Sequence, residues 1–301
     1  MMSALSFEKV HRQTIDNGET IAYRKKDGGP YNLVLIHGNL SASTHWDLLM
    51  EAISDDFTVY AFDLRGFGES SYENPVESIK DLAEDIAQAS DALGVDTYSV
   101  SGWGIGGAVA MRLALDHPDD VETLILLASC EVEGRPIKKR RFFGFLQAPG
   151  YIDTMKEMRK FLKPLQRVRE RKSPVKLKRI LNAAIFTKDK PHDRRYDRYI
   201  DALLKQRNHA EVNLAISRFN ISNKHNGLTE GTGEIEKLTL PTLILHGDED
   251  KVFMPEIAES NAEQLPNAEL NIIEGASHAI FVDQVRTVTD HFERFIKKQT
   301  T

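Results

Sequence analysis

The chain has 301 residues, of which 41% are hydrophobic and 28% charged, and its formal net charge is -6. This length suits one large α/β domain with an insertion, because about 250 residues is common for such a domain. The single Cys130 excludes an internal disulfide. The sequence has no metal-ligand spacing, no export signal and no apolar run of the roughly 20 residues that span a bilayer. We therefore expect a cytoplasmic protein with no metal and no other cofactor.

The charge is unevenly distributed along the chain. Residues 135–207 hold 23 Lys and Arg against 7 Asp and Glu, a surplus of 16 positive charges. The rest of the chain holds 16 basic and 38 acidic residues and is strongly negative. This asymmetry indicates an inserted module whose surface has a different task.

Short β-branched runs alternate with amphipathic helices through most of the sequence. This alternation predicts an α/β fold, with a mostly parallel central sheet flanked by helices. Two early runs, 10–15 and 20–24, predict an antiparallel hairpin around Asn17-Gly18. The predicted parallel strands are 32–36, 58–62, 98–101, 123–127, 242–246 and 269–273, and the predicted helices are 78–93, 105–117 and 287–297.

The pattern changes to helices alone between residues 133 and 233. Apolar residues recur there every three or four positions, beginning with Ile152 and Met155. We interpret 133–233 as a basic helical cap, inserted into a core made of 1–132 and 234–301.

A glycine-rich turn follows the predicted strand 98–101. The sequence runs Gly102-Trp103-Gly104-Ile105-Gly106 and continues into a helix, which is the strand, turn and helix context of the G-x-S-x-G nucleophile elbow. Taken alone, such a turn is equally compatible with a dinucleotide or phosphate loop. In the elbow interpretation, Gly104 occupies the position of the nucleophilic serine.

Residues 36–40 follow the first predicted parallel strand. The backbone N–H groups of Asn39 and Ile105 are the predicted oxyanion hole, because fixed donors there would stabilise a tetrahedral intermediate. For His37 we favour a role in supporting this loop over a role as acid or base.

The last two strands each end in a loop with a titratable residue. Asp250 and His278 follow them, in the chain order nucleophile, acid, histidine. Asp250 would orient His278, which would act as general base and then as general acid. Asp248 is the alternative acid, but its position favours a solvated loop carboxylate.

Taken in chain order, these motifs resemble the α/β-hydrolase superfamily, and the resemblance covers the chain apart from the cap. It implies a Ser-His-Asp triad that hydrolyses carboxyl esters. The motifs are 37–39 (HGN), 63–70 (DLRGFGES), the elbow, 247–250 (GDED) and 275–278 (GASH).

The elbow and the chain length are also similar to the intracellular poly(3-hydroxybutyrate) depolymerases of bacilli, whose motif reads G-W-S-x-G. This narrower resemblance rests on Trp103, which precedes the elbow centre. It implies a short-chain hydroxyacid polyester or oligomer as the substrate, and it makes Trp103 a candidate substrate-binding residue.

Gly104 departs from the family pattern. Glycine has no hydroxyl, so an acyl-enzyme cannot form at this position and the chain is predicted to be inactive. Ser99, Ser101 and Cys130 belong to strands or follow them, and we do not expect them to reach the site. A deliberate Ser-to-Gly substitution explains the retained acid, histidine and oxyanion loop better than natural drift does. The alternative is a natural ligand-binding pseudoenzyme or receptor.

The basic cap suggests a partner surface. Residues 138–141 are four cations, and they precede the aromatic run 142–146. This combination is typical of peripheral contact with an anionic membrane or polymer granule, although solvated helix faces would explain the charge as well. No nucleic-acid partner is expected, because no DNA- or RNA-reading motif accompanies the charge.

Overall fold

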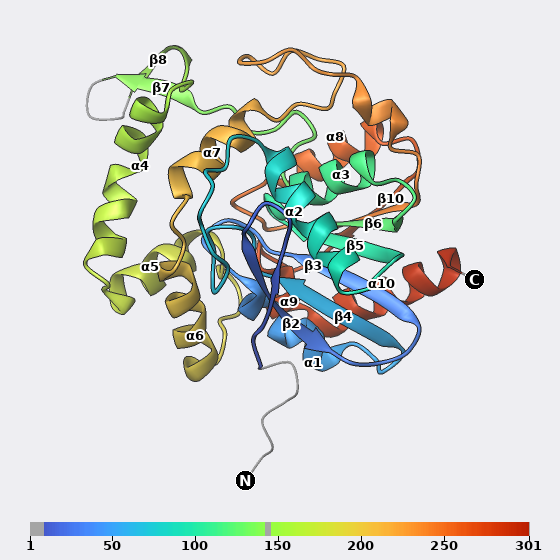
Figure 1. Cartoon of the computed structure of the whole chain (residues 1–301). Helices are drawn as coiled ribbons and strands as arrows, with labels where there is room; N and C mark the ends of the chain where they lie inside the picture. Colours follow the sequence, from blue (N-terminus) through green and yellow to red (C-terminus); the bar gives the residue numbers. More distant parts are fainter. Residues whose placement is uncertain (1–8, 142–145, 301) are drawn as a thin grey trace.

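The computed structural model describes residues 9–141 and 146–300 (Figure 1). At its centre is an eight-stranded sheet with the order β1-β2-β4-β3-β5-β6-β9-β10. β1 and β2 form the predicted antiparallel hairpin, and from β4 to β10 neighbouring strands are parallel. The strands are β1 (His11–Thr14), β2 (Thr20–Lys26), β3 (Tyr31–Ile36), β4 (Phe57–Phe62), β5 (Tyr98–Trp103), β6 (Val121–Leu127), β9 (Thr242–Gly247) and β10 (Ala268–Ile273).

Helices cover both faces of this sheet, which is why its central strands are apolar on both sides. Along β3, Val34 and Ile36 pack into one core cluster with α2, α3 and α8, while Leu33 and Leu35 pack into another with α1, α9 and α10. The predicted α/β fold, with a mostly parallel central sheet flanked by helices, is therefore confirmed. The helices are α1 (Asp47–Ala52), α2 (Ile79–Ala92), α3 (Gly106–Asp116), α8 (Pro255–Gln264), α9 (Ile280–Asp283) and α10 (Val285–Gln299), with the 3-10 turns η2 (Ser43–Trp46) and η3 (Glu234–Lys237).

The segment between β6 and η3 stands beside the sheet. In Figure 1, α4, α5 and α6 form a column at the left of the view, and the β7–β8 hairpin lies above α4. We call residues 133–233 the cap. Its elements are β7 (Lys138–Arg141), β8 (Leu146–Tyr151), α4 (Met155–Glu170), α5 (Pro174–Ala184), α6 (Asp193–Leu204) and α7 (His209–Arg218).

The prediction of helices alone in the cap was wrong at its beginning. β8 contains Pro149-Gly150, and Gly150 has φ +84°, so this stretch cannot continue a helix. Ile152, which was assigned to the helical stripe, precedes the N-cap Thr154 of α4. Residues 142–145, part of the predicted aromatic run, lie outside the described residues.

Polar contacts join the cap to the core. The buried Asp47, at the start of α1, accepts hydrogen bonds from Arg195 Nε at 2.9 Å, Arg198 at 2.8 Å and the Tyr199 hydroxyl at 2.5 Å, all on α6. Hydrogen bonds to a buried carboxylate are stronger than neutral ones, so α6 is held firmly against the core.

Within the ranges 9–141 and 146–300, no helix combines the length and the apolar character required to cross a bilayer.

Candidate active site

The glycine-rich turn joins β5 to α3 with a tightly packed backbone. A Cβ on Gly102 would lie 2.2 Å from the Gly106 carbonyl oxygen, and a Cβ on Gly106 would lie 2.4 Å from that of Ile36. Gly104 has φ +59°, in the left-handed region. The turn therefore has the sharp, close-packed geometry of an elbow, and its outer glycines leave room for neighbouring backbone.

Gly104 faces the imidazole of His278. A Cβ built on Gly104 would lie 3.4 Å from His278 Nε2 and 3.8 Å from the Gly38 Cα, both ordinary contact distances. A short side chain therefore fits here without displacing its neighbours, and its γ atom would be within reach of the imidazole nitrogen.

His278 is paired with Asp250. Its Nδ1 lies 2.8 Å from Asp250 Oδ2, and both side chains are buried. The backbone N–H groups of Val252 and Phe253 donate to Asp250 Oδ1 at 2.7 and 3.0 Å. Although burial opposes ionisation, hydrogen bonds from His246 and His278 hold the pKa of Asp250 well below its ordinary value. An ionised Asp250 accepts a hydrogen bond from the N–H at His278 Nδ1, so the other ring nitrogen, Nε2, faces Gly104.

Asp248, the alternative acid, lies elsewhere. Its side chain is exposed, and Oδ1 accepts a hydrogen bond from the Ala276 amide at 3.2 Å. Asp248 therefore orders the loop that precedes His278, without an ion pair to that histidine.

A second histidine, His246, contacts the same carboxylate and was not predicted. Its Nε2 lies 2.7 Å from the Phe253 carbonyl oxygen and 3.3 Å from Asp250 Oδ2. A carbonyl oxygen only accepts, so Nε2 carries the proton and donates to both oxygens. The sequence places His246 at the end of a strand, but only the structure reveals which carboxylate it contacts.

The two residues predicted as the oxyanion hole line the same cavity as Gly104 and His278. The loop of Asn39 is supported by the buried His37, whose Nε2 accepts from the Leu64 amide at 3.0 Å. His37 Nδ1 therefore donates to the Gly38 carbonyl oxygen, at 2.7 Å. This geometry matches a supporting role for His37. Ile105 is the first residue of the elbow beyond Gly104 and lies at the N-terminus of α3.

Trp103 lies in a different environment from the predicted one. Only 1% of its surface is exposed, and it is not among the residues that line the cavity. Its Nε1 donates to the His278 carbonyl oxygen at 2.9 Å, and its ring packs edge-on against Phe281. Trp103 therefore supports the loop that carries His278. Because it does not line the cavity, the prediction that it binds substrate is corrected: it is a positioning residue.

The candidate replacement nucleophiles are buried away from the cavity. Ser99 and Ser101 are fully buried within β5, and Ser99 Oγ accepts from Thr123 at 2.8 Å. Burial raises the pKa of the Cys130 thiol to about 12, which keeps it protonated at neutral pH. The expectation that none of these side chains reaches the space above Gly104 agrees with their absence from the residues that line the cavity.

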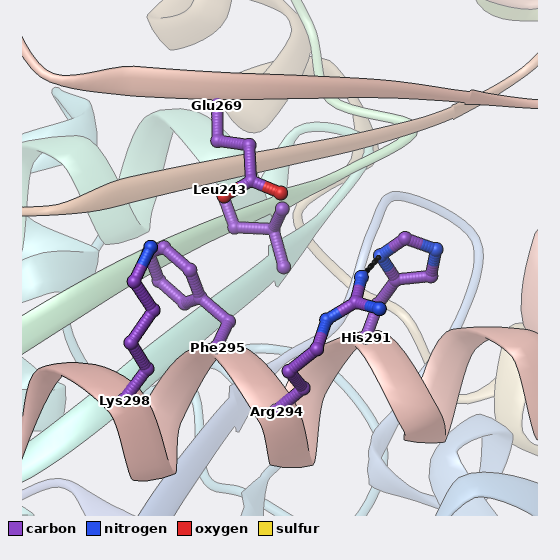
Figure 2. Close-up of a pocket in the computed structure, with 6 residues that line it drawn as sticks. All are labelled: Leu243, Glu269, His291, Arg294, Phe295 and Lys298. Carbon is purple, nitrogen blue, oxygen red and sulfur yellow. Dashed lines mark hydrogen bonds between the residues drawn. The ribbon is translucent and has the colours of Figure 1, made fainter.

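The cavity above the elbow has a volume of about 500 Å³, within the range of small-molecule sites. Core and cap residues both line it: Asn39, Leu40, Gly104, Ile105, Val252, Phe253 and His278 from the core, and Arg135, Pro136, Ile137, Phe161, Leu162, Leu165, Ile185, His209, Asn213 and Ile216 from the cap. Figure 2 shows a smaller cavity of about 170 Å³, lined by residues of α10, β9 and β10 with Arg294 hydrogen-bonded to His291. The larger cavity is lined by the predicted nucleophile position Gly104 and by His278, and it is the candidate active site.

The family model of the alpha/beta hydrolase fold matches residues 31–285, and the chain therefore belongs to this family. Solved esterases superpose on nearly the whole chain: an esterase from Exiguobacterium antarcticum superposes with a TM-score of 0.73 at 21% identity, over 95% of this chain and 98% of that one. An esterase from Thermogutta terrifontis superposes with a TM-score of 0.72 at 23% identity, over 97% of this chain and all of the other. At these identities the likeness shows the fold.

Curated relatives match a shorter part of the chain. A soluble epoxide hydrolase of Corynebacterium sp. is 37% identical over 125 residues, which is 41% of this chain and 43% of the relative. A pimeloyl-[acyl-carrier protein] methyl ester esterase of Nitrosomonas europaea is 35% identical over 120 residues, 40% of this chain and 41% of the relative. The matched segment thus spans less than half of each relative. Family and relatives support hydrolase activity in general.

Proposed function

We propose that the chain is the scaffold of a serine-type carboxylester hydrolase, in which Gly104 stands at the nucleophile position. The observation that carries this proposal is the 3.4 Å distance between a Cβ on Gly104 and His278 Nε2, together with the His278–Asp250 hydrogen bond. A serine at 104 would complete the Ser-His-Asp arrangement.

The reaction would use these residues in turn. The serine hydroxyl would attack the ester carbonyl carbon while its proton moves to His278 Nε2, and Asp250 would stabilise the resulting imidazolium. The N–H groups of Asn39 and Ile105 would stabilise the oxyanion. The C–O bond to the alcohol then breaks as His278 protonates the leaving oxygen, and a water activated by His278 releases the acid.

The chain as it stands would bind esters without cleaving them, since Gly104 has no hydroxyl. We propose that Gly104 results from a deliberate replacement of serine, because the buried acid, the histidine and the oxyanion loop retain mutually compatible positions. A natural ligand-binding pseudoenzyme is the alternative, and it predicts no activity even with the serine in place.

The experiment is to compare Gly104→Ser with Gly104→Ala on p-nitrophenyl acetate. The serine variant should hydrolyse it at least about 10³-fold faster than the original chain or the alanine variant, because the rest of the machinery is in position. The alanine variant has the same Cβ and backbone strain without a hydroxyl, so it isolates the nucleophile. No turnover by a folded serine variant would favour the pseudoenzyme.

For the substrate we propose a short-chain hydroxyacid ester or oligomer, such as one of 3-hydroxybutyrate. The support is the Gly-Trp-x-x-Gly elbow and a cavity of about 500 Å³, and the esterase names among the relatives favour ester bonds. A screen of the Gly104→Ser variant against simple esters, lactones and hydroxybutyrate oligomers would rank these classes.

We also propose that the cap attaches to an anionic membrane or granule surface. Lys138 and Arg140 are exposed on β7, and Phe161, Val175 and Ile180 expose apolar surface on α4 and α5. Exposed cations contribute about 1 kcal/mol each on strongly anionic membranes. Replacing Lys138 and Arg140 with Gln should therefore weaken sedimentation with phosphatidylserine vesicles. Replacing two exposed lysines outside the cap, Lys237 and Lys251, with Gln should not.

A further inference from the structure

His209 is a buried polar side chain that the proposed reaction does not use. It begins α7 in the cap, is only 6% exposed, and lines the cavity above Gly104. It also lines a neighbouring open pocket of about 320 Å³, whose wall includes cap residues such as Leu162 and Arg159. The imidazole therefore lies where the two spaces share a wall.

The imidazole Nδ1 of His209 is fully buried and has no hydrogen-bond partner within the described part of the chain. The backbone carbonyl of His209 is satisfied, since it accepts from Asn213 Nδ2 at 2.6 Å, so the atom left without a partner is Nδ1 of the ring. A buried polar atom without a partner destabilises a fold, and each one in a native structure calls for an explanation such as a catalytic role or a bound water or ion.

The ring is uncharged at neutral pH. Burial, together with the nearby Arg169 guanidinium, lowers the pKa of His209 to about 4. A neutral imidazole has one N–H donor and one nitrogen acceptor. It can therefore bind a hydroxyl or a carbonyl oxygen without the strong attraction that a cation would exert on carboxylates.

Most of the surrounding wall is apolar, including Leu162 and Ile216. In such a wall, one polar group fixes the orientation of a ligand and determines which ligand is preferred.

We propose that His209 is a specificity-determining residue that hydrogen-bonds a second oxygen function, a hydroxyl or an ester carbonyl, on the acyl part of the substrate. This inference rests on the proposed ester-hydrolase function and narrows its substrates to oxygen-bearing acyl groups. A plain aliphatic ester would leave His209 Nδ1 without a hydrogen-bond partner.

The chain can be tested as it stands, because without a nucleophile it binds esters intact. The probes are the methyl ester of the linear 3-hydroxybutanoate dimer and an isosteric pair, ethyl 3-hydroxybutanoate and ethyl 3-methylbutanoate, in which a methyl replaces the hydroxyl. Dissociation constants measured by NMR titration should favour the oxygen-bearing ligands by at least about 10-fold, since a site built for a hydrogen bond rejects the analogue that lacks it.

His209→Leu should remove this discrimination and leave the affinity for ethyl 3-methylbutanoate equal or higher, while His209→Gln, which keeps a donor and an acceptor, should retain part of it. His209→Leu removes an unpaired polar group, so it should fold, and a thermal melt checks this. Unchanged discrimination in folded His209→Leu would overturn the proposal, as would equal binding of the isosteric pair by the original chain.

Hydrolysis of p-nitrophenyl acetate by Gly104→Ser separates the two proposals, because an acetyl group carries no second oxygen function. Activity on acetate without His209-dependent discrimination would leave the hydrolase intact and sink the role of His209. Discrimination without any hydrolysis would support a binding role for His209 on a non-catalytic scaffold.

Discussion

Gln206, which lies between α6 and α7 of the cap, hydrogen-bonds the predicted oxyanion residue Asn39 and the next residue, Leu40. Its Nε2 donates to Asn39 Oδ1 at 2.7 Å, and its Oε1 accepts from the Leu40 amide at 3.1 Å. Leu40 has φ +57°, an unfavourable conformation for a residue with a side chain. The cap therefore supports the loop on which transition-state stabilisation would depend.

In the Gly104→Ser background, Gln206→Ala should lower kcat by about 10-fold or more with little change in KM, because a misplaced oxyanion donor affects the transition state more than the bound ester. Steady-state kinetics on p-nitrophenyl acetate measures both constants. Gln88→Ala, on α2, removes a comparable amide that bonds the Asp16 backbone and should leave both unchanged. A rise in KM alone would show that Gln206 affects binding only.

Introducing a serine at position 104 should lower the stability of the fold. Gly104 has φ +59°, and a residue with a Cβ in this region costs roughly 1–2 kcal/mol. Both Gly104→Ser and Gly104→Ala should therefore lower the free energy of unfolding in urea by about this amount, although only the serine variant gains activity. Gly94, with φ +68° and open space around its Cβ position, provides the control: Gly94→Ala should cost a similar amount. Unchanged stability of both Gly104 variants would contradict the argument.

Local sequence patterns were enough to predict the strands of the core and the chain order of the site motifs. Parallel strands such as β3 are buried on both sides, so their apolar runs are visible in the sequence. Because these strands end at the same edge of the sheet, the loops of Gly104, Asp250 and His278 could be predicted to converge. The same topology predicts that the loops of Asn39 and Asp248 lie at this edge of the sheet.

The remaining features depend on contacts between distant segments. The β7–β8 hairpin interrupts a region whose composition favours helices. His246 approaches Asp250 only because the chain turns back after β9. Gln206 and His209 lie in a cap whose packing against the core no periodicity reveals. The same holds for Trp103, whose position beside an elbow motif does not indicate whether its ring faces the cavity or the core.

Asp250 and Asp248 provide a matched pair within one loop. In the Gly104→Ser background, Asp250→Asn should reduce kcat by about 10³–10⁴-fold, since an amide cannot stabilise the imidazolium and can favour the wrong tautomer of His278. Asp248→Asn keeps an oxygen that can accept from the Ala276 amide and should change kcat less than about threefold, within the range expected of an exposed loop side chain. A larger loss at position 248 would reverse the assignment of the acid.

Two buried histidines should make the fold sensitive to mild acid. Burial lowers the pKa of His45 to about 3 and that of His209 to about 4, whereas an unfolded histidine has a pKa near 6.5. Between about pH 6.5 and 4 the unfolded chain therefore binds more protons than the folded one. Stability is fully present above pH 6.5 and falls as the pH is lowered, by up to about 1.4 kcal/mol per pH unit for each histidine.

Removing one of these histidines should flatten that dependence. Between pH 6 and 4.5, His209→Leu should reduce the slope of the unfolding free energy against pH by about 1.4 kcal/mol per pH unit, the contribution of one proton. His45→Asn, which keeps an acceptor for the Ala42 amide that bonds His45 Nδ1, should do the same. His225, whose side chain is exposed, gives the control, and His225→Gln should leave the slope unchanged. Urea titrations at several pH values measure it, and an equal slope in all variants would show that neither buried ring is protonated on unfolding.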